Sequence, residues 1–373
     1  MSDNQPLFKK SCKNVFIAAT GQNVGKTTTS MGMFFQLVKR NIKAGFTKPV
    51  GQRYVQVDDI KVDEDSHLLH NIYPTECELQ DMNPIAVPRG FTENYVDTGK
   101  KGEVIEKIVD SYKRIQGHSE FVVIEGTGHA GVGSIFDASN AVVASALQSK
   151  AIIVTNGGIG RSIDELVLNK NLFEQQGVEV LGVIINKVRE DKYEKVKKYT
   201  EKGLKRLGVK LLGVVPYMKL LSSPSIEQIA LTVKGEIIAG EEFRHTHVNN
   251  FVVGAMSVRH MLEYIKGKTF LIVPGDREDV ILAAISSGML DNDSENRICG
   301  ILITAFISPN KKIMNLIKSS KIPVIYCRHN TFTSASLVSD LAVKIQVTDL
   351  EKIKVSQNIF SQYIDFDYIC ENA

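Results

Sequence analysis

Short runs of apolar residues, rich in Val and Ile, alternate along the chain with longer stretches whose apolar positions recur at helical spacing. The short runs are continuous, which is typical of strands in a parallel sheet covered by helices on both faces. In the first part of the chain the predicted strands are 15–19, 45–50, 121–125, 151–155, 178–186 and 210–215. The pattern therefore predicts an α/β fold with right-handed crossovers.

This regular alternation is interrupted twice. Residues 74–101 contain several turn-prone dipeptides and little periodicity, so we predict an irregular excursion near the site. Residues 217–250 loosen again before a second αβ set, whose predicted strands are 248–253, 270–273, 298–304, 323–327 and 343–347. A last amphipathic helix is predicted over 349–363. We therefore expect two domains, 1–220 and a smaller 221–373 that includes the final helix.

A strand, a glycine turn and a helix start follow one another in residues 15–29. The turn fits the phosphate-loop pattern G-x-x-x-x-G-K-[ST] at its end, although Thr20 stands where the first glycine is expected. Such a turn aims backbone N–H groups and the positive end of a helix at one point. We therefore predict a nucleotide phosphate site, in which Lys26 reaches the β- and γ-phosphates and Thr27 coordinates Mg²⁺. The predicted binding residues of this turn are Gly21, Asn23, Val24, Gly25, Lys26, Thr27 and Thr28.

Charged side chains at two strand ends extend this prediction. Glu125 ends an apolar strand, and an acid at the carboxyl end of a parallel strand faces the ligand crevice. Lys48 also ends a strand and can add positive charge where phosphoryl transfer builds negative charge, so Lys26 and Lys48 are the predicted catalytic residues. The acids of residues 63–65 either supply a Mg²⁺ ligand or cap the helix that follows, and the sequence leaves both alternatives open.

Three other features are weaker candidates for chemistry. Residues 126–131 satisfy G-x-G-x-x-G, but the next strand ends without the acid that would hold a nicotinamide ribose, so we interpret them as a glycine-rich turn beside the phosphate site. His129 lies in that turn and is the one histidine that we single out. Asp276 and Arg277 at a strand end either bind a small anion or form a salt bridge that caps a helix.

Composition and charge narrow the class of protein. Of the 373 residues, 43% are hydrophobic and 23% charged, which is ordinary for a globular protein. The net charge of +3 is spread along the chain, and the most basic run, 187–210, is interpreted as a solvated helix face, so we predict no nucleic-acid partner. The five separated cysteines indicate reduced thiols in the cytoplasm. No apolar stretch reaches the ~18 residues that span a bilayer, so we predict no membrane partner.

Several of these segments resemble known families. Residues 20–27, Lys48-Pro49-Val50, Asp65, Glu125-Gly126 and 182–186 look like dethiobiotin synthetase and its relatives. Residues 48–54 and 125–134 are more closely similar to the N-terminal region of long phosphate acetyltransferases. Residues 274–279 and 300–304 look like the DRTGG domain that follows that region. The resemblance covers nearly the whole chain and implies a P-loop NTPase-type domain followed by a DRTGG-like domain.

The resemblance to dethiobiotin synthetase also implies roles for individual residues. It places Lys26 and Thr27 on phosphate and metal, Lys48 on the γ-phosphate, and Asn186 on adenine. It makes Asp65 and Glu125 ligands of Mg²⁺, beside Thr27. It further implies a homodimer with sites near the interface.

The chain differs from these families at three places, and the differences change the function that we expect. Gln52-Arg53-Tyr54 replace the small residues expected for the diamine substrate, Ala305-Phe306 replace the paired glycines of DRTGG, and an acetyltransferase domain is missing from a chain that stops at Ala373. We therefore expect no acetyl transfer by this chain alone. The first hypothesis is a nucleotide-sensing regulatory module that binds ATP and Mg²⁺ and serves a metabolic-enzyme partner. The alternatives are an ATP-dependent ligase acting on a small carboxylate, carbamate or amine, and a catalytically dead scaffold.

Overall fold

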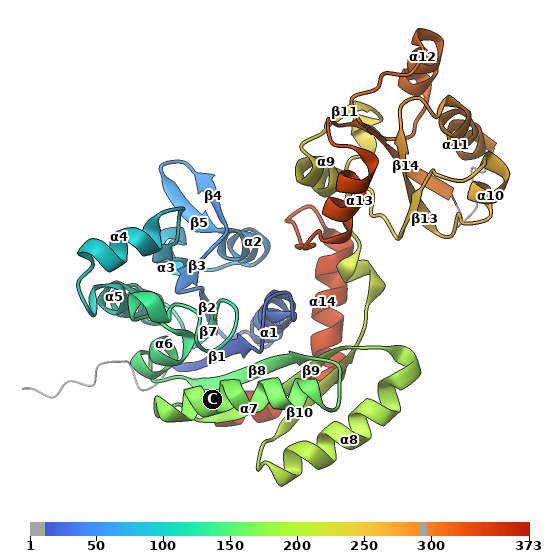
Figure 1. The fold of residues 1–373 in the computed structure, drawn as a ribbon. Coiled ribbons are helices and arrows are strands. Elements are labelled where there is room, and N and C mark those ends of the chain that lie inside the picture. Colours follow the sequence, from blue (N-terminus) through green and yellow to red (C-terminus); the bar gives the residue numbers. More distant parts are fainter. Residues whose placement is uncertain (1–11, 291–296) are drawn as a thin grey trace, which may run out of the picture. The chain divides into compact units, whose positions relative to one another are not determined.

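The computed structural model describes residues 12–290 and 297–373 of the chain. They form two compact units, one made of the chain up to Tyr217 together with Leu350–Ala373, and the other of Met218–Asp349 (Figure 1). Each unit is built around its own sheet, parallel in the first unit and mostly parallel in the second, as the runs of Val and Ile predict. The predicted fold class, a parallel sheet covered by helices followed by a smaller α/β domain, is confirmed.

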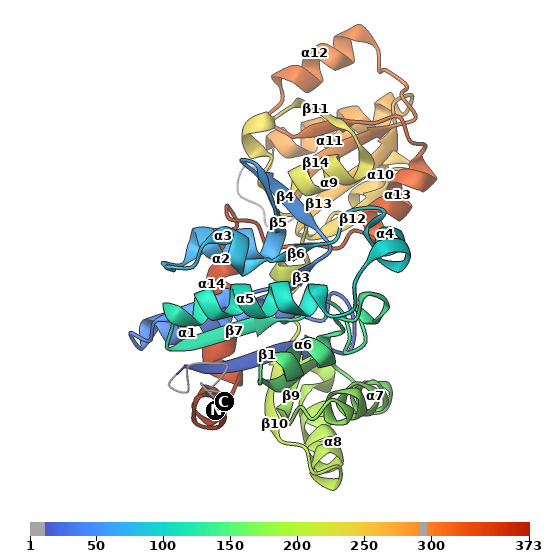
Figure 2. The same ribbon diagram turned by 90° about the vertical axis from the view of Figure 1, so that its left-hand side faces the viewer.

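The sheet of the first unit has six strands, within the described residues, in the order β10-β9-β8-β1-β7-β2, and all neighbours are parallel. These strands are β1 (Lys13–Ala19), β2 (Ala44–Thr47), β7 (Phe121–Glu125), β8 (Lys150–Asn156), β9 (Val180–Val188) and β10 (Leu211–Pro216). Their central residues are buried because helices cover both faces of the sheet (Figures 1 and 2).

The strand order reverses direction at β1, and this reversal positions the site. The chain runs from β1 outward to β2, returns to β7, and then crosses to β8 on the other side of β1. In open α/β sheets the crevice at such a switch point, at the carboxyl ends of the strands, is where ligands bind. The register places Ile17 of β1 opposite Glu125 of β7, so the end of β7 lies beside the turn that follows β1.

The helices that flank this sheet fall into two groups by their contacts. Helix α1 packs against α14, whereas α5, α6, α7 and α8 contact one another in succession. Their bounds are α1 Lys26–Lys39, α5 Glu103–Gly117, α6 Asn140–Ala146, α7 Arg161–Gln175, α8 Tyr193–Arg206 and α14 Leu350–Tyr363. A short helix, α15 (Phe366–Asn372), ends the chain.

Helix α14 lies where the sequence predicts a helix, but it packs on the first unit. Gly32 of α1 leaves so little room that an added Cβ would lie 2.3 Å from Cβ of Phe360. Gln357 donates a hydrogen bond to the Tyr73 hydroxyl at 2.9 Å, and Gly213 of β10 forms an isolated bridge with Ile364. The expected division assigned 221–373 to one domain; in the structure, residues 350–373 belong to the first unit because α1 and β10 provide their apolar partners.

The excursion between β2 and α5 is more regular than predicted. It contains the hairpin β4 (Tyr54–Val57) and β5 (Ile60–Asp63), the parallel pair β3 (Val50–Gly51) and β6 (Ile85–Ala86), and the helices α2 (Glu64–Ile72), α3 (Leu79–Met82) and α4 (Phe91–Thr98). The strands are only two to four residues long, too short for a recognisable apolar period.

The second unit has a five-stranded sheet, within the described residues, in the order β11-β15-β14-β13-β12. Among the strand pairs that the structure describes in this sheet, β11–β15 is antiparallel and the others are parallel. The strands are β11 (Glu236–Ala239), β12 (Asn250–Val253), β13 (Lys268–Pro274), β14 (Arg297–Thr304) and β15 (Val324–Tyr326); the helices are α9 (Ile226–Val233), α10 (Val258–Leu262), α11 (Glu278–Leu290), α12 (Lys311–Ser319) and α13 (Thr331–Ser339).

Two details of this unit differ from the prediction. The strand predicted over 343–347 is absent from the described structure; instead, the Gln228 side chain donates a hydrogen bond to the Lys344 carbonyl at 2.7 Å. Helix α9 occupies part of the stretch interpreted as loose, and it begins with a capping box in which Ser225 and Gln228 exchange hydrogen bonds.

Candidate functional site

The turn between β1 and α1 has the shape of a phosphate cradle. Gly25 has a φ of 112° and Asn23 a φ of 55°, so both take left-handed backbone that lets successive N–H groups converge. Gly25 cannot carry a side chain, because an added Cβ would lie 2.0 Å from Nδ2 of Asn186. Lys26 lies along the turn, where its Nζ donates to the Gly21 carbonyl at 3.1 Å. The backbone and this ammonium together suit an anion with several oxygens.

The end of β9 holds this turn from outside. Asn186 donates from Nδ2 to the Val24 carbonyl at 2.7 Å, and its Oδ1 accepts from the Lys187 backbone N–H at 2.8 Å. The sequence assigned Asn186 to adenine on the basis of a resemblance, and that contact stays a prediction. The structure gives the side chain a second role that the sequence did not reveal, because β9 and the turn are far apart in the chain.

The first turn of α1 meets the end of β7. The Thr27 hydroxyl donates to Glu125 Oε1 at 3.0 Å. Glu125 is only 1% exposed, and its Oε2 makes no hydrogen bond of acceptable geometry within the described residues. Burial raises the pKa of Glu125 and so does the charge of Asp65, whereas Lys48, the Ser30 hydroxyl and Lys26 act in the opposite direction. A buried carboxylate oxygen with spare acceptor capacity is suited to a cation.

Lys48 joins the same cluster from the end of β2. Its ammonium lies 2.9 Å from Asp63 Oδ1 and 3.8 Å from Glu125 Oε1, and it donates a hydrogen bond to Asp65. Burial lowers the pKa of Lys48, but the charges of Asp65, Glu125 and Asp63 outweigh it and hold the pKa above its usual value. Three carboxylates therefore surround one ammonium in a site that water scarcely reaches.

Of the two functions considered for the acidic segment at residues 63–65, the structure shows the helix cap, and the Mg²⁺ ligand stays a prediction. Asp63 caps α2, since its Oδ1 accepts from the Asp65 N–H at 2.9 Å, and it also pairs with Lys48. Asp65 is buried beside Lys48, whereas Glu64 is only half-buried. Asn83 fixes this arrangement by donating to the Lys48 carbonyl at 2.8 Å and accepting from the Asp63 N–H at 3.0 Å. The sequence revealed neither the ion pair between Asp63 and Lys48 nor the hydrogen bonds by which Asn83 connects them.

The glycine-rich turn after β7 is a structural neighbour of this cluster. Asn140 accepts from the Thr127 N–H at 3.1 Å and donates to the carbonyls of Thr127 and His129. The Thr127 hydroxyl donates to the Val50 carbonyl. His129 is exposed, and its Nδ1 accepts from the Gly131 N–H at 3.2 Å.

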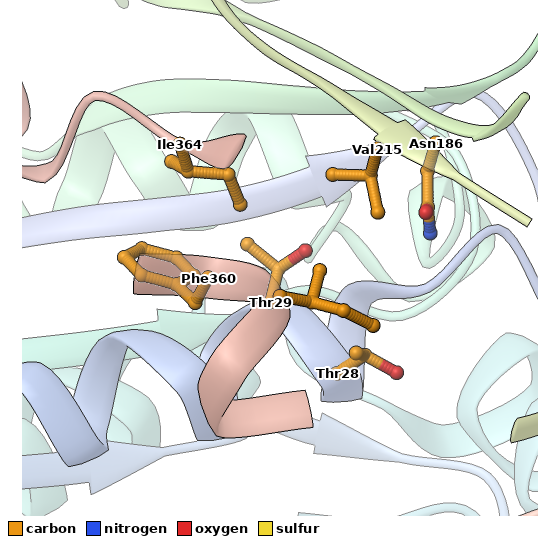
Figure 3. Close-up of a pocket in the computed structure, with 7 residues that line it drawn as sticks. Thr28, Thr29, Asn186, Val215, Phe360 and Ile364 are labelled. Atoms are coloured by element: carbon orange, nitrogen blue, oxygen red, sulfur yellow. The ribbon is translucent and has the colours of Figure 1, made fainter. Parts of the chain in front are cut away.

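An apolar pocket opens beside the phosphate turn. Figure 3 shows side chains from α1, β9, β10 and the C-terminal segment around it, and its lining residues are Thr28, Thr29, Asn186, Val215, Ile359, Phe360 and Ile364. Thr28, predicted to bind the nucleotide, therefore lines this pocket at the start of α1.

These residues fit a nucleotide with a magnesium ion. The left-handed glycine, the inward ammonium of Lys26 and the Thr27–Glu125 pair match a phosphate chain that carries a hard cation. The described residues contain no group of three or more His, Cys, Asp or Glu arranged to hold a metal ion. Phosphate oxygens and water would have to complete the coordination, as is usual for Mg²⁺.

Of the candidate residues Asp276 and Arg277, Arg277 has a structural role, and its salt bridge is with Asp279. The Arg277 guanidinium donates to Asp279 and to the backbone carbonyls of Gly254, Ala255 and Met256. Its donors are therefore directed at the protein itself. Of the two alternatives left open by the sequence, this geometry supports the salt bridge at the start of α11.

In the described ranges, no helix combines the length and apolar character needed to cross a bilayer.

The chain matches two family descriptions. Residues 13–225 match the family described as AAA domain, and residues 228–341 match the DRTGG domain. The predicted resemblance to a P-loop domain joined to a DRTGG domain is confirmed. The matched ranges contain β1 to β10 of the first unit and the five strands of the second.

Relatives match nearly the whole chain. A phosphate acetyltransferase of Pseudomonas aeruginosa is 26% identical over 371 residues, covering 95% of this chain and 51% of that protein. One of Nitratidesulfovibrio vulgaris is 24% identical over 362 residues, covering 94% and 50%. The chain thus spans about half the length of the curated relatives it matches.

Among solved structures, the MinD cell division protein of Aquifex aeolicus matches with 21% identity and a TM-score of 0.36, covering 57% of this chain and 85% of that one. A likeness at this TM-score carries no argument about fold or function.

Proposed function

Because the chain belongs to the AAA domain family and carries a DRTGG domain after its AAA domain, we propose that it is a regulatory module that binds ATP and Mg²⁺. The observation that carries the proposal is the preformed turn at Gly25, whose left-handed backbone brings the Lys26 ammonium and the start of α1 to one point. Acetyl transfer by this chain alone is not part of the proposal.

Each site residue has a role in this proposal. Backbone N–H groups of residues 21–27 receive the phosphates, and Lys26 turns from the Gly21 carbonyl to the β- and γ-phosphates. Thr27, Asp65 and Glu125 would hold Mg²⁺, with Glu125 Oε2 offering an oxygen that has spare acceptor capacity. Mg²⁺ would neutralise phosphate charge when bound. Lys48 remains near the γ-phosphate, held by three carboxylates.

The regulatory part of the proposal rests on domain content. The match to phosphate acetyltransferases extends through both domains and covers about half of each relative. We propose that nucleotide occupancy of the AAA domain biases the DRTGG domain, and through it a metabolic-enzyme partner. A homodimer and a cytoplasmic location stay predictions of the sequence.

A second candidate function is an ATP-dependent ligase for a small carboxylate, carbamate or amine. The observation that favours it is the buried position of Lys48 beside Glu125, because positioned charges are nearly all that phosphoryl transfer requires of a protein.

Isothermal titration with ATP and Mg²⁺ tests nucleotide binding. We expect wild type to bind and Lys26→Ala to lose at least about tenfold in affinity, since hydrogen bonds to charged groups contribute about 1.5–3 kcal/mol. Lys39→Ala, in the last turn of the same helix, is the matched control and should bind like wild type. Equal affinity of wild type and Lys26→Ala would overturn the nucleotide assignment.

Phosphate release then separates the two functions. A panel of small carboxylates and amines should leave a regulator's slow turnover unchanged, whereas strong stimulation by one compound would identify a ligase. In either case Glu125→Gln should lower Mg²⁺-dependent turnover while the protein stays folded. Equal turnover would remove Glu125 from the metal site.

A further inference from the structure

Lys187, the residue after Asn186, was interpreted from the sequence as part of a solvated helix face, but in the structure it lies in β9, half-buried against the phosphate turn. It has a φ of 57°, a left-handed conformation that is uncommon for a residue with a long side chain. Its ammonium donates to the Asn23 carbonyl at 2.5 Å. Within the described residues Lys187 forms no ion pair with a carboxylate, and the hydrogen bond of its ammonium is made to the backbone of the turn.

Two consecutive carbonyls of the turn are thus held by two consecutive side chains of β9. Lys187 binds the carbonyl of Asn23, and Asn186 binds that of Val24 at 2.7 Å. The C=O and N–H of a planar trans peptide point in opposite directions. Holding these carbonyls from outside therefore turns the N–H groups of Val24 and Gly25 toward the other side, where the phosphates of the proposed function would lie.

The backbone of Lys187 contributes to this arrangement. The left-handed φ brings the Lys187 side chain toward the turn directly after Asn186, so that both residues can reach it. A left-handed non-glycine residue costs of order 1–3 kcal/mol, and such residues cluster where the fold positions functional groups. Lys187 is half-buried where it makes this contact, and burial lowers the pKa of its ammonium.

We propose that Lys187 is a positioning residue of the nucleotide site, which together with Asn186 holds the phosphate turn in its anion-binding shape before the phosphates arrive. The inference rests on the proposed function, since it concerns the binding of a nucleoside triphosphate at the same turn. Without this contact, only part of the population has a binding-competent turn, and the apparent affinity falls by that fraction.

Substitutions can separate the side chain of Lys187 from its backbone. Lys187→Asn keeps a residue that tolerates left-handed backbone but cannot reach the Asn23 carbonyl. Lys187→Arg keeps a long cationic donor. Lys192→Asn is the matched control, because Lys192 is exposed and lies outside β9.

We expect Lys187→Asn to weaken ATP binding about tenfold in calorimetry, the loss that follows from one hydrogen bond to a charged group. Lys187→Arg should recover most of that loss, and Lys192→Asn should bind like wild type. Stopped-flow mixing with a fluorescent ATP analogue gives a second readout. Its observed rate should rise linearly with concentration in wild type and level off in Lys187→Asn, where the turn must first adopt the competent shape.

Three results would contradict the inference. If Lys187→Asn binds ATP like wild type while Lys26→Ala does not bind, the positioning role fails and the nucleotide site stands. If Lys187→Asn lowers the melting temperature of the nucleotide-free protein and Lys187→Arg rescues nothing, Lys187 only supports the fold. If wild type itself does not bind ATP, the proposed function fails and the inference fails with it.

Discussion

The two sheets of this protein differ in how the charged side chains at the carboxyl ends of their parallel strands are paired. In the first unit, Lys48 is 6% exposed and lies among three carboxylates, one of which has an oxygen with spare acceptor capacity. In the second unit, Arg277 directs its donors at backbone carbonyls and at an exposed carboxylate. The first edge buries a cluster of charges where the proposed ligand would bind, whereas the second uses its charge to hold its own loops.

The two edges also differ in how they use left-handed backbone. The first places glycine at φ 112°, where no side chain fits. The second has Ala305 at φ 66° and Phe306 at φ 55°, where the resembling family has paired glycines. The Phe306 ring lies against Tyr326 and under the Arg328 guanidinium. Architecture alone therefore does not indicate a ligand site; the residues at the strand ends decide it.

The largest contrast is expected from removing the central cation of each edge. Lys48→Met leaves three buried carboxylates without their ammonium and should cost roughly 3–5 kcal/mol of unfolding free energy. Arg277→Met should cost at most about 2 kcal/mol, because its partner Asp279 is exposed and can be solvated when the guanidinium is removed. Urea unfolding followed by hydrogen exchange of peptides from each unit gives both values. Equal losses would remove the distinction between the edges.

A similar contrast is expected for one phenylalanine in each unit. Phe360 of α14 is 1% exposed and packs on Gly32, so Phe360→Ala should destabilise the first unit by roughly 3–5 kcal/mol. Phe332 of α13 is 82% exposed, and Phe332→Ala should change stability by no more than about 0.5 kcal/mol. Thermal unfolding of both variants tests this. A first unit that tolerates Phe360→Ala would place α14 outside its core.

Gly25→Ala tests the need for glycine at the first edge. The left-handed φ and the contact with Asn186 should together cost roughly 1–3 kcal/mol and abolish ATP binding. Gly208→Ala is the control, because Gly208 has a φ of 66° but nothing within 4 Å of an added Cβ. It should lose some stability and keep its ATP affinity. Calorimetry would contradict the cradle if Gly25→Ala bound ATP normally.

Glu125→Gln should stabilise the nucleotide-free protein by about 1 kcal/mol at neutral pH, because ionising a buried carboxyl is costly. The folded protein raises the pKa of Glu125, so it binds this proton more tightly than the unfolded chain does. Ionisation of Glu125 therefore costs stability as pH rises above the unfolded pKa of about 4.3, and the advantage of the variant should vanish as pH falls toward 4. Urea midpoints across pH 4–8 measure it, with the exposed Glu106→Gln as control.

The smallest effect is expected at the second edge. Ala305→Gly relieves a left-handed alanine but adds freedom to the unfolded chain, so a net gain of about 0.5 kcal/mol is expected. Differential scanning calorimetry should show a slightly higher melting temperature for the second unit. A clear loss would mean that the methyl group of Ala305 contributes packing that outweighs the strain.

Much of the fold could be predicted because the central strands are buried on both faces. The strand over 121–125 has the bounds of β7, since every position in it is apolar until Glu125. The hairpin β4–β5 was missed because its strands have only four residues each and carry no continuous apolar run. The capping box at Ser225 was readable as Ser-x-x-Gln, but nearby turn residues favoured a loop.

The sequence could predict the site residues that belong to a motif, a strand end or a family resemblance, but not those whose roles come from contacts between distant segments. Lys26, Thr27, Lys48, Asp65 and Glu125, identified by motif, strand end and family resemblance, are brought together in the structure. Asn83 and Lys187 were not identified, since their roles come from hydrogen bonds to residues distant in sequence. Likewise, the helix at 349–363 was predicted from the spacing of its apolar residues. That spacing does not show that Phe360 packs against Gly32 of α1.

The return of α14 to the first unit has a consequence for biosynthesis. A ribosome completes β10 before it makes Met218–Asp349, and only afterwards the helix that covers α1. Until then the groove at Gly32 faces water, and the emerging AAA domain is an unfinished substrate for chaperones and proteases. Early folding of the inserted segment would shorten the effective loop between β10 and α14 and so lower the entropy cost of closing it. Of the two units, the first is thus begun before the second but completed after it.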